Sequence, residues 1–258
     1  MKTLKNRILS GAMAGVLAMS LAVPAFAAGG TPAPAATNTT EIDGTYTPIT
    51  IEVVVPANGN ATINPYGLPI DVTKSDSTTK VSFENQKIMT APTVAIKNKM
   101  KVDLTVKASV TGAIKALPTG STATPMKLAI EALTADVTAK SVFAYVQAKP
   151  SAQTGADDAT LADALIDEYA AWDQDYDATK DILVKVGTET KENFVTLKAA
   201  EMDTAANGGG FKAYKAGSVA LIRVAGDVVA SPKEAWTADD GFTAKIAYTF
   251  APAPAAAP

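Results

Sequence analysis

The chain has 258 residues, which is enough for one large domain or two small ones. It contains no cysteine and no histidine, which excludes a disulfide framework, Ser–His and Cys–His catalysis and the HExxH metalloprotease motif. The formal net charge is −3, and loss of Lys2, Lys5 and Arg7 with a leader would leave 20 basic residues against 26 acidic ones. This balance argues against nucleic acid or an anionic membrane as a partner.

Residues 1–27 have the three parts of a secretory signal peptide. Lys2, Lys5 and Arg7 form its positive region, residues 8–23 its apolar run, and Ala25-Phe26-Ala27 its small-x-small cleavage site. The alternative is a retained transmembrane anchor, but the apolar run is short for a bilayer and is interrupted by glycine. We therefore expect a secreted protein that is extracellular or held at the cell surface.

Two segments of low complexity flank the expected folded part. Residues 28–45 are rich in proline, alanine and threonine and predict a flexible leader. Residues 252–258 form a similar Pro/Ala tail, and the C-terminus carries no LPxTG-type sorting sequence, so covalent wall anchoring is not expected. Residues 46–251 are predicted to form a single β-sandwich domain.

The first half of this domain predicts a series of short strands. In chain order they are residues 49–55, 80–84, 93–97, 101–110, 126–132 and 141–147. Residues 101–110 give the clearest signal, because apolar and polar side chains alternate without interruption and therefore point to opposite faces. Residues 141–147 are apolar on both faces, which is typical of a strand covered on both sides.

Two loops with turn-forming residues separate these strands. Residues 64–69, Asn-Pro-Tyr-Gly-Leu-Pro, predict an elaborate turn, in which we expect Tyr66 to be a buried tyrosine corner or plug rather than part of a ligand-binding loop. Residues 118–125 form a second loop rich in glycine, threonine and proline.

Residues 157–176 predict an amphipathic helix of about four turns. Leu161, Leu165, Tyr169 and Trp172 recur at steps of three and four residues, and Asp157 or Asp158 can cap the helix start. We expect an insertion that lies across the end or edge of the sandwich and packs on its core. The alternative is a helix that docks a partner chain.

After the helix, the pattern returns to strands. They are predicted at residues 181–186, 194–197, 218–224 and 241–250, and residues 207–210 (Asn-Gly-Gly-Gly) predict a hairpin or loop tip rather than a phosphate loop. The total of nine to eleven strands, frequent turns and one helix indicates an all-β sandwich or a closed barrel.

One group of carboxylates has a spacing that suits a metal. Asp173, Asp175, Asp177 and Asp181 occupy positions 1, 3, 5 and 9 of a calcium-type loop, but Ala178 and Val184 stand where glycine and glutamate belong. An acidic, solvated helix end is the preferred interpretation. We therefore expect no catalytic, cofactor-binding or metal-ligating residues and no cofactor, although a carboxylate-only hydrolase stays open as an alternative.

Three parts of the chain resemble a known family. They are the exported leader with its Thr/Asn segment, residues 83–110 with the turn Lys97-Asn98-Lys99, and the closing strand at residues 238–251. Together they resemble the TasA/camelysin class of secreted Gram-positive matrix proteins, and also WxL-like surface proteins. Trp236-Thr237-Ala238 is not the Trp-x-Leu motif, so peptidoglycan binding does not carry over, and without histidine neither does camelysin-type proteolysis.

The resemblance implies a jelly-roll-like antiparallel sandwich that polymerises into extracellular fibres, with an N-terminal strand of one subunit completing a sheet of the next. Residues 39–55 are where such a donor strand is expected, and the alternative is an ordinary edge strand within its own sheet. The leading hypothesis is thus a non-enzymatic structural protein of the surface or biofilm matrix, with itself as partner. The alternative is a surface adhesin or a carbohydrate or cell-wall binding module that uses loops 64–69 or 118–125.

Overall fold

The computed structural model describes residues 52–56, 61–172, 175–203 and 210–254. The chain divides into two units, Met1–Glu52 and Val53–Pro258, and all described residues after Glu52 belong to the second unit. The predicted signal peptide, the leader and the first part of the strand predicted at residues 49–55 lie outside the described residues. In the part of the chain that is described, no helix is long and apolar enough to cross a membrane.

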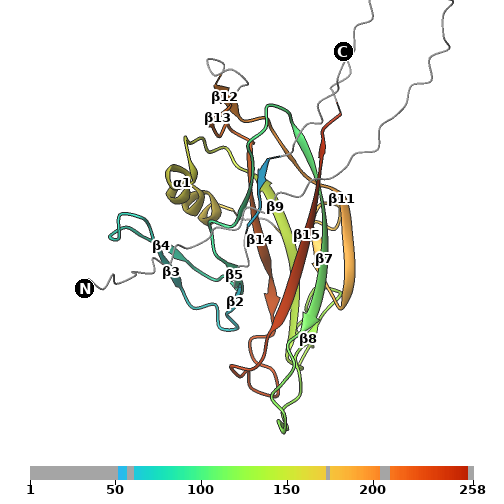
Figure 1. The fold of residues 1–258 in the computed structure, drawn as a ribbon. Coiled ribbons are helices and arrows are strands. Elements are labelled where there is room, and N and C mark those ends of the chain that lie inside the picture. The colour runs from blue at the N-terminus through green and yellow to red at the C-terminus, as the bar shows by residue number, and fades with distance from the viewer. Residues whose placement is uncertain (1–51, 57–60, 173–174, 204–209, 255–258) are drawn as a thin grey trace, which may run out of the picture. The chain divides into compact units, whose positions relative to one another are not determined.

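Two sheets form the body of the second unit, and their strands are antiparallel except for β8 (Figure 1). The larger sheet has the order β1–β6–β14–β9–β10, with β8 beside β9; its strands are β1 (Val53–Val54), β6 (Ala95–Asn98), β14 (Val219–Val228), β9 (Ser141–Pro150), β10 (Ile182–Val184) and β8 (Lys127–Leu128). The smaller sheet has the order β11–β7–β15, with β11 (Gly187–Leu197), β7 (Leu104–Ile114) and β15 (Phe242–Pro252). The predicted all-β sandwich with one helix is confirmed.

Three two-stranded pairs complete the strands of the described residues. They are β2 (Ala61–Ile63) with β5 (Ile88–Thr90), β3 (Ile70–Thr73) with β4 (Lys80–Phe83), and β12 (Glu201–Asp203) with β13 (Gly210–Ala213). Of these six strands only β4 was predicted, so the predicted number of strands is too low. The other five have three or four residues each, so any alternation in them covers at most two residues on each face.

The long strands follow the predicted burial. In β7, Leu104, Val106, Ala108 and Val110 are fully buried and alternate with half-exposed polar residues, and Ser141 to Gln147 in β9 are all buried. Strand β7 begins at Leu104 rather than at residue 101, because Asn98 holds the preceding turn. Its side-chain amide donates to the carbonyls of Val102 and Lys198, and its side-chain oxygen accepts from the backbone N–H of Met100.

Two further predicted strands differ clearly from the observed ones in their bounds. Only Lys127–Leu128 of the predicted segment 126–132 is a strand. Strand β11 begins at Gly187, seven residues before the predicted start. Its first half, Gly-Thr-Glu-Thr-Lys-Glu-Asn, has no apolar face, and pairing with β7 rather than burial makes it a strand.

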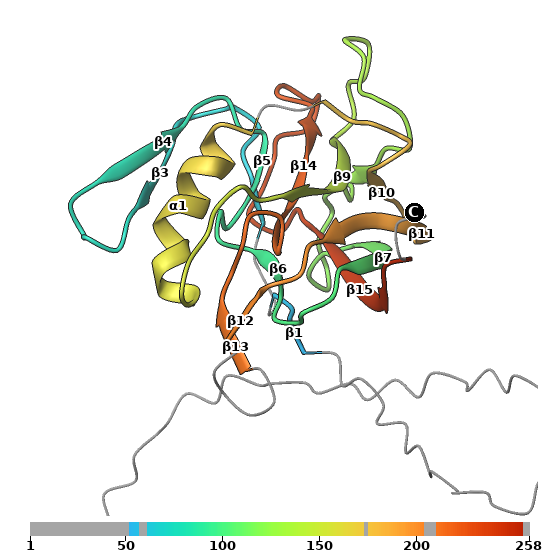
Figure 2. The same ribbon diagram turned by 90° about the horizontal axis from the view of Figure 1, so that it is seen from above.

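The helix α1 (Asp158–Ala170) begins as predicted and ends six residues early. Asp157 is its N-cap, and the Asp157 carboxylate and the Thr160 hydroxyl form a reciprocal capping box. The apolar side of α1 is buried against Val219 and Leu221 of β14, on the outer face of the larger sheet and beside the β3–β4 hairpin (Figure 2). The helix therefore packs on the core as expected, but it covers a sheet face rather than the end or edge of the sandwich.

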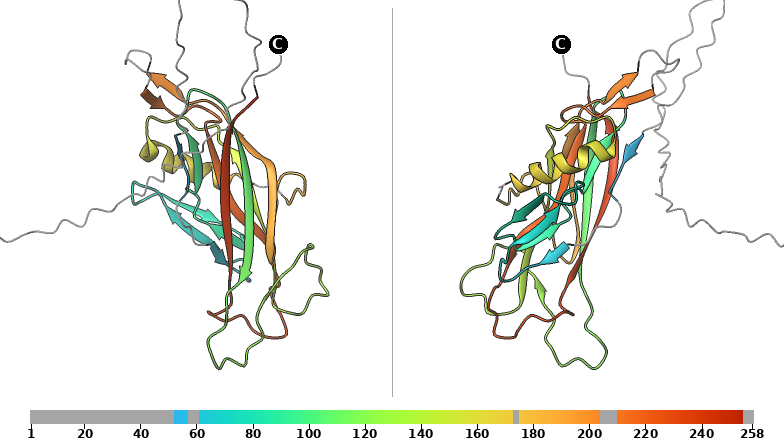
Figure 3. Two further views of the ribbon diagram at one scale, coloured as in Figure 1. Left: turned by 45° about the vertical axis from the view of Figure 1, so that its right-hand side comes forward. Right: turned by 90° about the vertical axis from the view of Figure 1, so that its left-hand side faces the viewer.

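In the described part of the chain, backbone pairing between strands joins the two sheets along one side only. At the β10–β11 side, the N–H of Gly112 in β7 donates to the carbonyl of Lys185, and a Cβ at residue 112 would lie 2.5 Å from that oxygen, so only glycine fits. At the other side, β14 leads to β15 through residues 229–241, but these two strands do not pair. Figure 3 shows β15, β7 and β11 side by side, with β15 at one margin. The sandwich is thus closed at β10–β11 and open at β15.

Candidate functional site

The open edge of β15 is the most distinctive interaction feature of the described residues. Within them, β15 is hydrogen-bonded to β7 along its whole length and to no other strand. The carbonyl of Gly241 accepts from the N–H of Lys115, and the N–H of Ala253 donates to the carbonyl of Asp103. In an antiparallel ladder alternate residues bond to the same neighbour, so odd-numbered residues of β15 bond to β7 and even-numbered ones direct their N–H and C=O groups outward.

The even-numbered side chains of β15 face the interior of the sandwich but are only partly buried. This set was predicted to share one face: Phe242, Ala244, Ile246, Tyr248 and Phe250. Each is half-buried, whereas Val106, Ala108 and Val110 on the same face of the neighbouring β7 are fully buried. Burial still suffices to raise the pKa of the Tyr248 phenol, so this side chain stays neutral. The apolar face of β15 is therefore incompletely covered.

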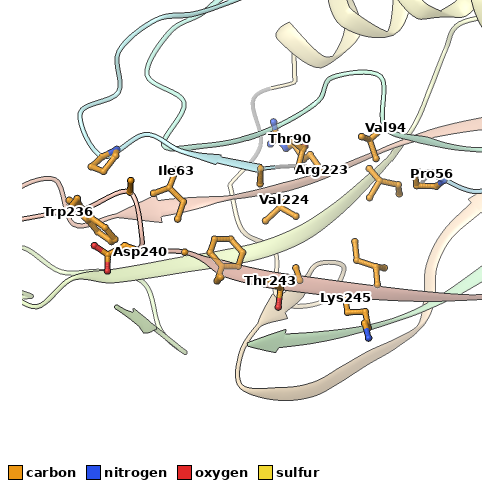
Figure 4. Close-up of a pocket in the computed structure, with 18 of the residues that line it drawn as sticks. Pro56, Ile63, Thr90, Val94, Arg223, Val224, Trp236, Asp240, Thr243 and Lys245 are labelled. Carbon is orange, nitrogen blue, oxygen red and sulfur yellow. The ribbon is translucent and has the colours of Figure 1, made fainter. Parts of the chain in front are cut away.

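A groove of about 770 Å³ lies between β15 and the larger sheet (Figure 4). One wall is β15 from Phe242 to Ile246, together with Tyr248. The opposite wall combines Ile222 and Val224 of β14 with side chains from segments distant in sequence: Pro56, Ala61, Ile63, Pro65, Thr90 and Val94. Most of these side chains are apolar, and the free backbone groups of β15 border them.

One end of the groove is closed by the turn that leads into β15. The indole N–H of Trp236 donates to the carbonyl of Val229, at 2.8 Å. The carboxylate of Asp240 accepts from the N–H and hydroxyl of Thr237 and from the ammonium of Lys140. Burial opposes ionisation of Asp240, but the Thr237 N–H and the Lys140 ammonium outweigh it, and the pKa of the carboxyl lies below its ordinary value. These bonds fix the position at which β15 begins.

The chemistry of the groove suits an extended peptide. An incoming strand would find unpaired N–H and C=O groups along one side and apolar side chains along the other, which are the two components of strand addition. Within the described residues there is no group of three or more carboxylates that could hold a metal ion, here or elsewhere. The one carboxylate at the groove, Asp240, is already held by Lys140 and Thr237.

Two carboxylates of the candidate calcium-type loop, Asp177 and Asp181, have hydrogen-bond partners within the chain. Asp173 lies outside the described residues, and the predicted helix end is absent, because α1 ends at Ala170. Asp177 accepts from the N–H and hydroxyl of Thr179, and Asp181 is buried, where it accepts from Gln147 and from the N–H of Asp177. These two carboxylates thus serve as turn and core hydrogen-bond acceptors.

Gln147 links Asp181 to a buried arginine. The Arg223 Nε donates to the amide oxygen of Gln147 at 2.8 Å, and its Nη1 donates to the carbonyl of Trp172 at 2.7 Å. Its guanidinium also lies 4.1 Å from the centre of the Trp172 ring. Burial raises the pKa of the Asp181 carboxyl in spite of its hydrogen bonds. The network is structural: it joins β9, β14 and the chain after α1.

The prediction for Tyr66 is wrong. Asn64 is buried and pins its own loop, since its amide donates to the carbonyls of Leu68 and Gln86 and its oxygen accepts from the N–H of Leu68. This arrangement leaves Tyr66 67% exposed and Leu68 63% exposed at the loop surface. Tyr66 is therefore neither a buried tyrosine corner nor a plug of the loop.

The structure also describes parts of two further predicted loops and of the first predicted strand. The loop at residues 118–125 is mostly exposed, and its Thr124 N–H donates to Glu234. Strands β12 and β13 pair on either side of the glycine-rich segment, whose tip lies outside the described residues. In β1, Val53 and Val54 pair with Asn98 and Lys97 of the same chain, so this part of the predicted donor region 39–55 belongs to its own sheet.

Sequence reasoning found β15 but not the groove. The alternation in β15 is the same as in β7, and only the neighbouring chain decides whether such an apolar face is covered. Comparison of the chain with protein-family models, with curated proteins and with solved structures gives no match in any of the three.

Proposed function

We propose that this protein is a secreted, non-enzymatic structural protein whose copies assemble into fibres by strand addition. In this proposal, a segment at residues 39–51 of one copy adds to the free edge of β15 in the next and covers its groove. The observation that carries the proposal is the outward-directed backbone of β15 beside a half-covered apolar wall. Natural proteins seldom leave so long an edge unprotected unless another chain pairs with it.

The sequence before β1 has the composition of such a strand. Residues 39–51, Thr-Thr-Glu-Ile-Asp-Gly-Thr-Tyr-Thr-Pro-Ile-Thr-Ile, are rich in β-branched and aromatic side chains. They follow a Pro/Ala-rich leader. A leader of this composition can extend to another copy without unfolding a helix or a strand. A contact between this segment and β15 joins two different surfaces, so it repeats head to tail and builds an open fibre rather than a closed dimer.

The test compares three purified chains by electron microscopy and light scattering. We expect filaments from residues 28–258, and also from a control that lacks only residues 28–38. Removal of residues 28–51 leaves β1 and the groove intact and is expected to give monomers. Added in excess to the full chain, this truncated chain should shorten the filaments, because it offers a groove but no donor. Filaments of unchanged length and number from the truncated chain would contradict the proposal.

A second function is favoured by one observation, the exposed Tyr66 on a loop that Asn64 holds in place. A fixed, exposed aromatic ring can stack on a sugar, which is the property expected of a carbohydrate-binding or adhesive surface module. Glycan-array binding by a monomeric chain that is lost in Tyr66→Ala would support this function. If neither the parent chain nor Tyr66→Ala binds a glycan, fibre assembly remains the proposed function.

A further inference from the structure

We propose that the incoming strand runs antiparallel to β15, with Ile49 and Ile51 facing into the groove and Tyr46 and Pro48 facing solvent. The inference rests on the proposed strand addition and specifies its polarity and the face that binds. It follows from three observations: the bonding pattern of β15, the single proline in the donor segment, and the direction of β1.

The bonding pattern of β15 restricts which donor residues can bond. Its free N–H and C=O groups belong to the even-numbered residues, and their side chains, such as Ile246, face the groove. In an antiparallel ladder, the donor residues opposite these positions bond to them and also face the groove. In a parallel ladder, the bonding donor residues are the neighbours of those opposite, and they face solvent.

Pro48 then distinguishes the two faces of the donor. Proline has no N–H, so in an added edge strand it must stand where that group would point to solvent. An antiparallel donor therefore turns Pro48 outward and places these residues in the groove: Thr45, Thr47, Ile49 and Ile51. A parallel donor would place the other set there: Ile42, Gly44, Tyr46 and Pro48.

The groove favours the antiparallel set. Its walls are formed mostly by apolar side chains, including Ile63, Ile222 and Val224, with a half-buried Ile246 opposite them. Ile49 and Ile51 are β-branched and apolar and pack well on a pleated surface. The parallel set would instead present Gly44, which has no side chain to fill the groove, next to Tyr46.

The direction of β1 leads to the same polarity. Val53 pairs with Asn98, at the end of the sheets where β15 finishes, because β1 and β14 run in one direction and β15 in the other. In the proposed fibre, the donor segment therefore leads into Val53 at that end. In a fibre whose copies share one orientation, the segment enters the next copy at its Phe242 end and runs opposite to β15.

The donor must come from a second copy. Strand β15 rises about 3.3 Å per residue, so its Phe242 end lies on the order of 30 Å from the end near Val53. Ile51 is two residues from Val53 and can reach only about 7 Å from it. Ile51 therefore cannot lie beside Phe242 of its own chain, and with so short a connection successive copies must meet end to end.

Disulfide mapping tests the polarity directly, because the natural chain has no cysteine. One copy carries Lys245→Cys or Ala247→Cys on the exposed face of β15, and the other carries a single cysteine in the donor segment. Tyr46→Cys and Thr50→Cys are the positions that should cross-link, and Thr47→Cys and Ile49→Cys are the matched controls. In the new ladder the outward pairs are the closely spaced ones, about 4.5 Å between Cα atoms, which suits a disulfide.

We expect mixed disulfides, identified by mass spectrometry and reversed by reductant, from the even-numbered donor positions only. Links from positions 47 and 49 alone would show a parallel donor and overturn this inference while strand addition stands. Links from all four positions to a similar extent would show a strand without a fixed face and would also overturn it. An absence of links from every position would remove both the polarity and the proposed function.

A proline exchange tests which donor residues bond to β15, whereas the disulfides report the polarity. Thr47→Pro removes an N–H that the antiparallel donor directs at β15, whereas Tyr46→Pro removes one that points to solvent. We expect filaments from the Tyr46→Pro chain and few or none from the Thr47→Pro chain. The reverse result would overturn the inference, because it would place the even-numbered donor residues, Pro48 among them, where an N–H must bond to β15.

Discussion

The ammonium of Lys140 lies 3.0 Å from both carboxylate oxygens of Asp240, and each of the two side chains is only 1% exposed. Lys140 directly precedes β9 of the larger sheet, and Asp240 precedes β15 of the smaller one. The ion pair therefore ties the two sheets together where the groove begins, on the side of the sandwich that no strand pairing closes.

Asp240→Asn should lower the free energy of unfolding by about 3 kcal/mol, because it leaves the buried ammonium of Lys140 without its close counter-charge. Urea denaturation of the monomeric chain lacking residues 28–51 measures this effect. The double variant Lys140→Met/Asp240→Leu should recover most of the loss, since it removes both buried charges. Equal stability of Asp240→Asn and the parent would show that the pair contributes little.

Acid should destabilise the fold below about pH 4. A carboxyl whose pKa is lower in the folded chain than in the unfolded one contributes stability at higher pH, and this contribution is lost as the pH falls through the folded pKa. Hydrogen bonds from Thr79 and from Thr179 lower the pKa values of Asp76 and Asp177 to about 2, and that of Asp240 is also lowered. The raised pKa of Asp181 acts in the opposite direction.

Stability measured by denaturant titration from pH 5 to pH 2 should therefore fall, with most of the loss between about pH 4 and pH 2. The decline should be shallower in Asp240→Asn than in the parent chain, because one of the responsible carboxyls is absent. A parent curve that is flat or rises over this interval would contradict the assignment.

Gly112→Val should be severely destabilising. A Cβ at residue 112 would lie 2.5 Å from the Lys185 carbonyl oxygen and 2.9 Å from Val184, so the joined side of the sandwich would have to separate. Overpacking of this kind costs about 1–3 kcal/mol, and the lost hydrogen bond from Gly112 to Lys185 adds to it. Ala113→Val, on the exposed face of the same strand, is the control and should melt within a few degrees of the parent.

Asp157→Ala should cost about 1 kcal/mol, because the N–H of Thr160 loses its capping partner. Thermal unfolding followed by circular dichroism gives the value. Asp157→Asn is the matched control, since asparagine caps a helix about as well as aspartate, and it should retain most of the stability. If both variants unfold at the parental temperature, the cap is not stabilising.

Ile246→Asp should prevent filament formation and leave the monomer folded. Its side chain is half-buried and faces the groove, where a carboxylate would be desolvated by an incoming strand but can stay hydrated in the monomer. The neighbouring Ala247 points to solvent, so Ala247→Asp should still assemble. Electron microscopy of both variants, with melting curves to verify folding, makes the comparison.

Much of the fold follows from local pattern. The alternation in β7, the doubly apolar β9 and the three- and four-residue spacing of α1 each predict the observed element, because their side-chain period states which face is buried. The short strands β2 and β5 and the first half of β11 carry no such period, and β3 alternates over only four residues. Their identity depends on a partner strand elsewhere in the chain, which local sequence cannot supply.

The candidate site shows the same limit. By itself the sequence determined that residues 241–250 form a strand with one apolar face, because a two-residue period needs no knowledge of neighbours. Only the tertiary structure decided that this strand lies at an open edge, beside a groove whose other wall comes from β2, β14 and residues 90–94. Whether an apolar face is covered depends on which distant segments of the chain pack against it, and local sequence does not contain this information.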